Sequence, residues 1–503
     1  MSALVPRVPS AIAGALVALG FLTEAGGNRH VLWTLLVAAG TLVSWNALLI
    51  WRRHSTNRTL NIAVVVRTQH YLQACAQGSV LVYWGWHWRP VYDAAPLIAA
   101  QLLFAYAFDM LLAWSRRDVY TLGFGPFPVI FSINLFLWFS PDWFYFQFLM
   151  IAVGFAAKEL IRWSRNGRRV HIFNPSSFPL ALASLLLILA GASDITRGQD
   201  IAISQFYPPQ MYLLLFLVAL PGQFLFGVAS MTLSAVLTTY LCSLAYFAAT
   251  GTYLFYDSYV PIAIFLGMHL LFTDPSTSPH SELGRLLFGA LYGLSSVGLY
   301  VLLGAIGVPT FYDKLLQVPV LNVSVKLLDR LTRSNVLKGL EPVRIGRALA
   351  PRQRNLAYMA VWATVFVGLS ATRGLGDRHP GQWLPFWVQA CGNGLPRACA
   401  YVANLQSIYC GAGSGWACNQ RGMIDETSAP FERGCRLGFV PACRNIGRVG
   451  SASPGFERAP PTMADYPILL RGSKGPITER SPAALQTRAC GQGWPDTCGP
   501  TSP

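Results

Sequence analysis

Charged residues are scarce in this chain, and acidic residues are the scarcest. Only 12% of its 503 residues are charged, whereas 53% are hydrophobic. Soluble domains carry about a quarter charged residues, so this composition excludes an ordinary soluble protein. Long apolar stretches recur up to about residue 372, and each could cross a hydrocarbon core about 30 Å thick. The sequence therefore predicts an all-α polytopic membrane protein.

Familiar enzyme motifs are also missing from the sequence. It contains no phosphate-binding loop, no c-type haem motif, no HExxH helix and no nucleophile elbow. The net charge of +16 could suit nucleic acid, but the basic residues gather in short loops between apolar stretches. That distribution fits the positive-inside rule. The expected partner is the lipid bilayer, and no nucleic acid is expected.

The apolar stretches predict about 12–13 transmembrane helices. Residues 330–354 hold seven basic residues and one acid, which places them in the cytoplasm. A cytoplasmic position for this segment requires residues 311–329 to cross the membrane as a weakly apolar span. Lys314 and Lys326 would then extend outward near the ends of that span. A last span then carries the C-terminus out to the periplasm. The predicted spans lie near 10–23, 31–51, 70–88, 94–114, 127–141, 143–162, 177–193, 209–227, 230–250, 258–273, 285–307, 311–329 and 355–371.

The tail after residue 372 holds eight of the ten cysteines, in four pairs with seven residues between the members of each. Such spacing suits a disulfide between adjacent helices across a tight glycine-containing turn, whereas a zinc site would need Cys-x-x-Cys. Disulfides require an oxidising compartment, which agrees with a periplasmic tail. The predicted bridges are Cys391–Cys399, Cys410–Cys418, Cys435–Cys443 and Cys490–Cys498.

The paired cysteines resemble degenerate Sel1-like repeats of the cysteine-rich kind, over roughly 385–450 and 485–499. The resemblance implies stacked helical pairs that dock another protein. A small disulfide-stapled cap with no specific partner is the alternative.

Two polar motifs open apolar segments about one hundred residues apart. The first, residues 171–177, reads HIFNPSS, and the second, residues 273–279, reads TDPSTSP and is followed by Gly284-Arg285. Each looks like a helix N-terminal cap, because Asn174 or Asp274 can accept hydrogen bonds from the free backbone N–H groups. The proline that follows suits a first helical turn. Such helix ends attract anionic groups, and the alternative is that both motifs only cap buried helices.

These motifs resemble the two signatures of the RnfD/NqrB family, over about residues 125–330. The segment Ala157-Lys158 before the first motif, and residues 284–290, 307–309 and 318–329 after the second, match the same pattern. The resemblance implies a bacterial inner-membrane subunit of an electron-transport complex, coupled to ion transport. It also implies a noncovalent flavin, either FMN or riboflavin, or a quinone. The implied cofactor-binding residues are Asn174, Ser176, Thr273, Asp274 and Thr277.

One family feature is missing, because residues 191–197 lack the Ser-x-Ala-Thr-like loop that attaches a flavin. Covalent FMN is therefore not expected. The Phe-Asn-Pro-Ser form also resembles orphan RnfD-like proteins associated with enediyne biosynthesis. Two other functions stay open: a small-molecule or ion transporter on the same scaffold, and a non-catalytic anchor that docks partners through its periplasmic repeats.

Several further residues carry weaker signals. Asp109 could face a site or pair with Arg116 or Arg117, and His269 could face the motif cavity or bond to a neighbouring helix. Trp84, Trp86 and Trp88 fit an interfacial aromatic belt. The predicted domains are N-terminal helices at 1–124, a core at 125–330, a basic segment at 331–354, a last helix at 355–372 and the cysteine-rich domain at 373–503.

Overall fold

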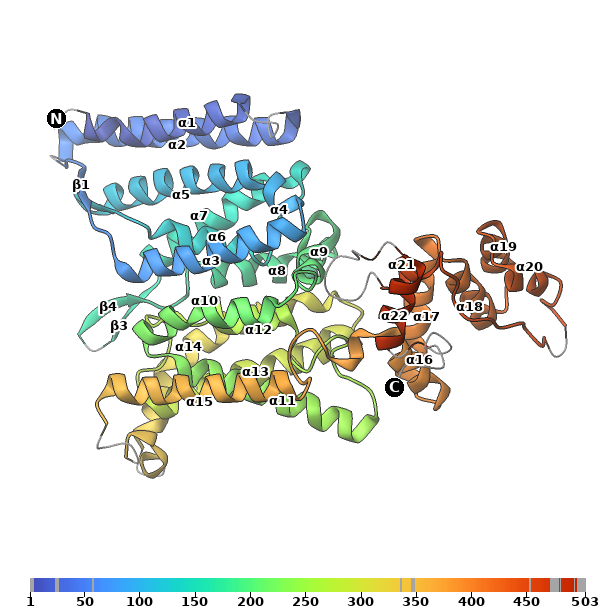
Figure 1. Cartoon of the computed structure of the whole chain (residues 1–503). Coiled ribbons are helices and arrows are strands. Elements are labelled where there is room, and N and C mark those ends of the chain that lie inside the picture. Colours follow the sequence, from blue (N-terminus) through green and yellow to red (C-terminus); the bar gives the residue numbers. More distant parts are fainter. Residues whose placement is uncertain are drawn as a thin grey trace. The chain divides into compact units, whose positions relative to one another are not determined.

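The computed structural model describes residues 4–22, 27–56, 58–165, 167–334, 337–344, 349–451, 454–470, 479, 481–492 and 494. Helices dominate these residues (Figure 1), and the strands among them form two short two-stranded pairs. The chain divides into two compact units. Unit 1 comprises residues 1–242 and 260–368, and unit 2 comprises residues 243–259 and 369–503.

Unit 1 is built from helices, most of which run side by side in Figure 1. Each of the predicted spans contains one of them. The last residues of α11 and α15 belong to unit 2. The helices are α1 (Val8–Leu22), α2 (Arg29–Thr56), α3 (Thr68–His87), α4 (Pro90–Asp93), α5 (Ala95–Arg116), α6 (Pro126–Asn134), α7 (Tyr145–Leu160), α8 (Ser177–Ala190), α9 (Gly198–Ser204), α10 (Met211–Phe226), α11 (Ala229–Thr250), α12 (Ile262–Leu270), α13 (Glu282–Ala305), α14 (Gln317–Thr332) and α15 (Pro351–Ala371).

Four helical segments are long and apolar enough to cross a membrane: Arg29–Arg53, Ala95–Arg116, Ala229–Thr250 and Glu282–Ala305. The number of crossings stays a prediction. The spans expected near 127–141 and 258–273 differ from the structure, because α6 and α12 have only nine residues each. At a rise of 1.5 Å per residue, each reaches less than half of the ~30 Å hydrocarbon core.

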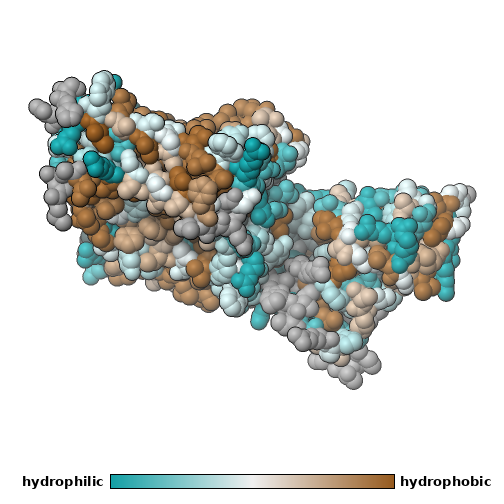
Figure 2. All heavy atoms as spheres, turned by 90° about the horizontal axis from the view of Figure 1, so that it is seen from above, coloured by the Kyte–Doolittle hydropathy of each residue, from teal (hydrophilic) through white to brown (hydrophobic). Residues whose placement is uncertain are grey.

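Large apolar side chains are exposed on the outer helices of unit 1. Phe21 of α1 is 67% exposed, and Trp33 and Trp51 of α2 are 56% and 72% exposed. Figure 2 shows apolar side chains spread over the helices of this unit. An exterior of this kind is unfavourable in water but suits contact with lipid hydrocarbon, in agreement with a membrane protein.

The strands lie in the connections between helices. β1 (Asn61–Val64) pairs in parallel with β2 (Val119–Leu122). β3 (Arg162–Arg165) and β4 (Arg168–His171) form an antiparallel pair between α7 and the first motif. Because β4 ends at His171, this pair fixes the start of the motif.

One of the two expectations for lysine side chains at helix ends is corrected by packing. Lys314, in the 3₁₀ helix η5 (Thr310–Lys314), is only 4% exposed, and its Nζ lies 3.2 Å from Oδ1 of Asp313. A buried ammonium needs such a partner, so the outward-reaching position predicted for Lys314 is wrong. Lys326 is exposed and lies 4.5 Å from the centroid of the Trp163 ring.

Of the three tryptophans predicted to form an aromatic belt at the end of α3, one has an exposure compatible with that prediction. Trp86 is 69% exposed, as an interfacial residue should be. Trp84 instead stacks on Trp88 at 5.1 Å between ring centroids, and Trp88 stacks on Trp138 at 5.6 Å. Trp84 and Trp138 are buried, so they belong to the interior of unit 1.

Unit 2 stacks short helices that are joined by disulfide bonds. The bridges Cys391–Cys399, Cys410–Cys418 and Cys435–Cys443 form as predicted, whereas Cys498 lies outside the described residues. The Cys490–Cys498 bridge therefore stays a prediction. The helices are α16 (Leu384–Gly392), α17 (Pro396–Gly411), α18 (Gly415–Asp425), α19 (Ser428–Arg436), α20 (Val440–Ile446), α21 (Tyr466–Leu469) and α22 (Pro482–Gly491).

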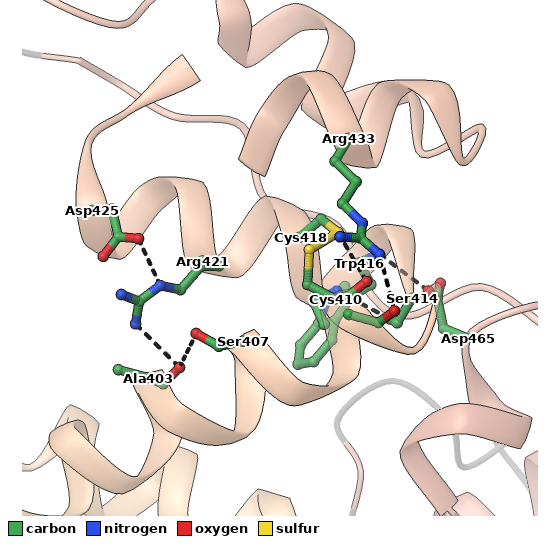
Figure 3. Close-up of a disulfide and its surroundings, with 12 residues drawn as sticks. Ala403, Ser407, Cys410, Ser414, Trp416, Cys418, Arg421, Asp425, Arg433 and Asp465 are labelled. Carbon is green, nitrogen blue, oxygen red and sulfur yellow. Dashed lines mark hydrogen bonds and ion pairs between the residues drawn. A yellow bond between two sulfur atoms is a disulfide. The ribbon is translucent and has the colours of Figure 1, made fainter. Parts of the chain in front are cut away.

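Asp465 secures the turn between α17 and α18. Its Oδ1 accepts bonds from the Ser414 hydroxyl at 2.7 Å and the Trp416 N–H at 3.1 Å, beside the Cys410–Cys418 bridge (Figure 3). Its Oδ2 accepts bonds from the N–H and hydroxyl of Thr462. One buried carboxylate thus joins two turns of the stack.

The loop after α11 also belongs to unit 2, which the sequence did not indicate. Tyr253 packs against Phe386 at 4.6 Å between ring centroids, and Tyr256 stacks on Tyr401 at 3.9 Å. The side-chain amide of Gln382 donates to a backbone carbonyl of the same loop, at Asp257. Residues 243–259 therefore contribute aromatic rings to the core of this unit.

Candidate functional site

The first motif forms a closed turn before α8. The side-chain Oδ1 of Asn174 accepts the N–H groups of Ser176 at 2.9 Å and Ser177 at 3.2 Å. Asn174 thus caps the first turn of α8, as predicted from the Asn-Pro pair. Gly154 of α7 lies against this turn, where a Cβ atom would collide with the Pro175 carbonyl oxygen. The turn is therefore fixed by its own bonds and by close packing.

The second motif forms an equivalent turn but does not cap a helix. Oδ1 of Asp274 accepts the N–H of Ser276 at 2.9 Å. The next helix, α13, begins only at Glu282, and its N-cap is Ser281, which accepts the Gly284 N–H. The capping role predicted for Asp274 is wrong. A physical reason is Pro279, which disfavours helical geometry in the residue before it.

The structure brings the two motifs together. Nε2 of His171 lies 3.3 Å from Oδ2 of Asp274. Asn322 of α14 also joins them, since its Oδ1 accepts the Asn174 N–H at 3.2 Å and its amide donates to the Thr277 carbonyl at 3.1 Å. One titratable pair and one bridging amide thus connect segments about a hundred residues apart in sequence.

A cavity of about 100 Å³ lies between the motifs. Asn174, Ser176 and Asp274 line it, so three of the five predicted cofactor-binding residues meet there. A water molecule occupies about 30 Å³ of liquid, so this space suits a few waters or a small ion. Further lining side chains include His70, Gln73, Ser132, Lys158 and His171.

The environment of Asp274 favours its charged form. Burial raises the pKa of Asp274, but the hydrogen bond and charge of His171 and the bonds from Ser276 outweigh this effect. The pKa of the carboxyl is therefore held below its usual range. At neutral pH, Asp274 is therefore an anion, and its Oδ2 lies 3.3 Å from Nε2 of His171.

A second cavity, of about 240 Å³, adjoins the first and shares His70, Gly125 and Lys158 with it. Its lining is rich in basic side chains, and Asp109 also faces it. Arg116 and Arg117, the partners considered for Asp109, pair instead with Glu159, at 3.6 Å and 2.8 Å. The charged residues around this cavity are Arg67, Asp109, Arg117, Lys158, Glu159 and Arg162.

The broken end of α12 lies at the first cavity, where Leu270 forms part of the lining. A helix end frees carbonyl groups that need partners inside a membrane. The amide of Gln77 donates to the Leu270 carbonyl at 3.4 Å, and the amide of Asn174 donates to the Leu271 carbonyl at 2.9 Å. Asn174 therefore supports both the α8 start and the α12 end.

The broken end of α6 is supported by a separate set of amides. Gln205 donates to the Leu135 carbonyl at 2.5 Å, and Gln147 donates to the Leu137 carbonyl at 3.4 Å. Asn134, the last residue of α6, exchanges amide hydrogen bonds with Gln101. Two buried half-helices thus end in amide-rich surroundings, one in each half of unit 1.

The other predicted site residues lie outside this cavity. Thr273 lines a neighbouring cavity of about 20 Å³ together with His269, and Thr277 lines neither of them. Sequence reasoning missed His70, Gln73 and Gln77 of α3. Their polar character in an apolar helix was a usable signal, because polar groups inside a span face the bundle interior.

No protein-family model, no curated protein and no solved structure matches this chain. The functional argument therefore rests on the residues and the geometry given above.

Proposed function

We propose that this chain is a bacterial inner-membrane protein that moves a small ion through unit 1, as a subunit of an RnfD/NqrB-like electron-transport system. The observation that carries the proposal is the broken helix α12, which ends at the cavity holding the His171–Asp274 pair. Discontinuous helices with a charged side chain at the break are typical of membrane ion and substrate sites. A second short helix, α6, lies in the other half of the unit and supports the comparison with membrane ion and substrate sites.

The charges at this break favour an ion over an apolar substrate. The carbonyl end of α12 is partly negative, and Asp274 adds a full negative charge beside it. Lys158 lines the same cavity and brings a positive charge to it, and Nε2 of His171 lies 3.3 Å from Oδ2 of Asp274. A site of this kind suits a small cation.

The basic cavity supports a noncovalent flavin as a second candidate. The motif cavity alone is smaller than the 300–1,000 Å³ of usual ligand pockets, but together with the second cavity it reaches the lower limit. Arg67, Lys158 and Arg162 would hold a phosphate such as that of FMN. A bound flavin would supply electron transfer next to the ion site.

The disulfides of unit 2 support a periplasmic position for that unit, because such bridges persist in oxidising compartments. We propose that its stacked helical pairs dock other subunits of the same complex.

The test is ion flux into proteoliposomes that contain the full-length chain. An imposed membrane potential should drive ion uptake, and Asp274→Asn should reduce the rate at least tenfold, because it removes the charge beside His171. Asp200→Asn is the matched control, since Asp200 is a surface residue of α9 whose side chain is 61% exposed. Equal flux in the wild type and in protein-free vesicles would refute the proposal.

The absorbance spectrum of gently purified protein tests the second candidate. Flavin bands that weaken in Lys158→Gln but persist in Lys326→Gln would support a cofactor in the basic cavity, because Lys326 does not line it. A wild-type protein without flavin absorbance would refute the bound flavin and leave the ion-moving function standing.

A further inference from the structure

We propose that the ion moved by unit 1 is a proton, and that His269 relays it through one water molecule held in the small cavity beside the motifs. This inference rests on the ion-moving function proposed above and names the ion. Its basis is a set of buried polar atoms that the two motifs do not use.

His269 lies on α12 and is 3% exposed. Its Nδ1 lies 2.7 Å from the Phe265 carbonyl oxygen, which can only accept a hydrogen bond. Nδ1 therefore carries the ring proton, and Nε2 presents a bare lone pair. Within the described residues, Nε2 has no hydrogen-bond partner.

Gln223 of α10 presents two more unsatisfied atoms. Its side chain is 1% exposed, and both its Oε1 and its Nε2 lack partners among the described residues. Leaving such atoms unpaired costs about 1–3 kcal/mol for each group, so a partner is expected. Gln223 and His269 line the same cavity of about 20 Å³.

That volume accommodates one water molecule, and the water would have two to four polar partners. The Gln223 amide can donate to the water, and the water can donate to Nε2 of His269. The unsatisfied atoms and the size of the cavity thus point to the same occupant.

The small cavity adjoins the site already described. It shares Gln73 and Leu270 with the motif cavity, which holds the His171–Asp274 pair. The proposed route therefore passes through adjoining cavities, from the basic cavity, past Asp274, to His269. Phe265 and Trp362 pack against the His269 ring, at 4.1 Å and 5.8 Å between ring centroids.

The surroundings favour a proton over a metal cation such as Na⁺. A bare cation needs several oxygen ligands, which broken helices usually supply as free carbonyl groups. Here the freed carbonyls already accept side-chain bonds, those of His269 and Met268 from threonines and those of Leu270 and Leu271 from amides.

Titratable groups around His269 are few. α3 contributes only Leu72, Gln73 and Ala76 to the cavity, and α10 contributes apolar residues besides Gln223. Among the described lining residues, His269 alone can gain a proton, and none is charged. The nearest acid along the route is Asp274, in the adjoining cavity.

The relay step conserves protons. An excess proton that reaches the water passes to Nε2, which leaves the water neutral and the imidazole ring positive. Each ring nitrogen then carries one proton, and Nδ1 keeps its bond to Phe265. Return of the proton from Nε2 to a neutral water, which then carries the excess proton, restores the starting tautomer.

The experiment measures proton and sodium uptake separately, in proteoliposomes of the full-length chain under the same potassium diffusion potential. An internal pH dye reports protons, and radioactive sodium reports Na⁺. The wild type should move protons and no measurable sodium. His269→Gln and Gln223→Leu should each lower proton uptake at least tenfold, because the first removes the proton acceptor and the second removes partners of the water.

The matched control is His87→Gln, which alters a histidine of α3 that lines none of these three cavities. It should leave proton uptake within twofold of the wild type. Melting curves and elution volumes identify any variant that misfolds, and the ion selectivity of the wild type decides the proposal without any variant.

Each outcome has a distinct meaning. Sodium uptake without proton uptake would overturn the proton assignment but leave the ion-moving function standing. Unchanged proton uptake in a folded His269→Gln protein would overturn the relay role. Absence of uptake of either ion by the wild type would overturn the proposed function and this inference with it.

Discussion

Unit 1 joins its segments with hydrogen bonds from amide and hydroxyl side chains, whereas unit 2 joins its helices with covalent bridges. The described cysteines of unit 1, Cys75 and Cys242, are free, and those of unit 2 are paired. Hydrogen bonds such as those of the Asn322 side-chain amide can exchange partners, whereas a disulfide cannot without redox chemistry. The comparison suggests a unit built to change partners and a unit built to stay fixed.

Reduction should separate the two units most strongly. Each described bridge closes a loop with a sequence separation of 8 residues, for which chain entropy predicts about 2.5 kcal/mol of stabilisation. A strong reductant should therefore unfold unit 2 and leave unit 1 folded. Limited proteolysis with fragment identification would show this as selective cleavage after residue 372. Equal resistance of both units in reductant would show that the bridges do not stabilise unit 2.

Asn322→Leu tests the amide side of the comparison. The change leaves the Asn174 N–H and the Thr277 carbonyl without their partner, which should cost unit 1 about 3 kcal/mol. Ser324→Ala, on the same helix, is the control, because the Ser324 hydroxyl bonds only within α14. Thermal unfolding followed by cysteine accessibility at Cys242 should show an earlier transition for Asn322→Leu alone.

Asp465→Asn asks whether unit 2 also depends on a polar junction. The new amide nitrogen would face donors at Thr462 or Ser414, so a loss of about 2–3 kcal/mol is expected. Asp425→Asn is the control, because Asp425 forms a half-exposed ion pair with Arg421 on the same stack (Figure 3). Such pairs contribute at most about 1 kcal/mol. Similar melting of both variants would mean that Asp465 adds nothing beyond the bridges.

The stability of unit 2 should also fall at acidic pH, with a smaller effect than those above. Burial lowers the pKa of His379, in unit 2, to about 3. Because the folded pKa lies below the unfolded value of about 6.5, the stabilisation is complete above pH 6.5 and is lost as the pH falls toward 3. Unit 2 should lose about 2 kcal/mol between pH 7 and pH 5.

The measurement is urea unfolding of the full-length chain at both pH values, followed by proteolysis after residue 372. His379→Gln should abolish most of the difference. A pH response that persists in this variant would assign it to other groups.

The sequence predicted the helices well but could not reveal their breaks. Apolar residues resume directly after Asn134 and continue from Leu135 through Phe139, so the hydrophobic pattern does not end where α6 ends. The break depends on Gln147 and Gln205, which come from later segments of the chain. Local patterns carry no information about such distant partners.

The candidate site was predictable only where its sequence signals are local. Asn-Pro and Asp-Pro pairs are local signals, and both turns form where the pairs stand. The delayed start of α13 followed from Pro279, a local signal that was overlooked. The contribution of α3 had a local signal in its polar side chains, whereas the membership of residues 243–259 in unit 2 depends on tertiary packing and had no local signature.

The central claim is that ion movement depends on the motif cavity of unit 1 and not on unit 2. Its most direct test compares potential-driven ion uptake by Asp274→Asn, Asp465→Asn and the wild type in matched proteoliposomes. The account predicts at least a tenfold loss for Asp274→Asn and near-normal uptake for Asp465→Asn. Normal uptake by a folded Asp274→Asn protein would contradict it.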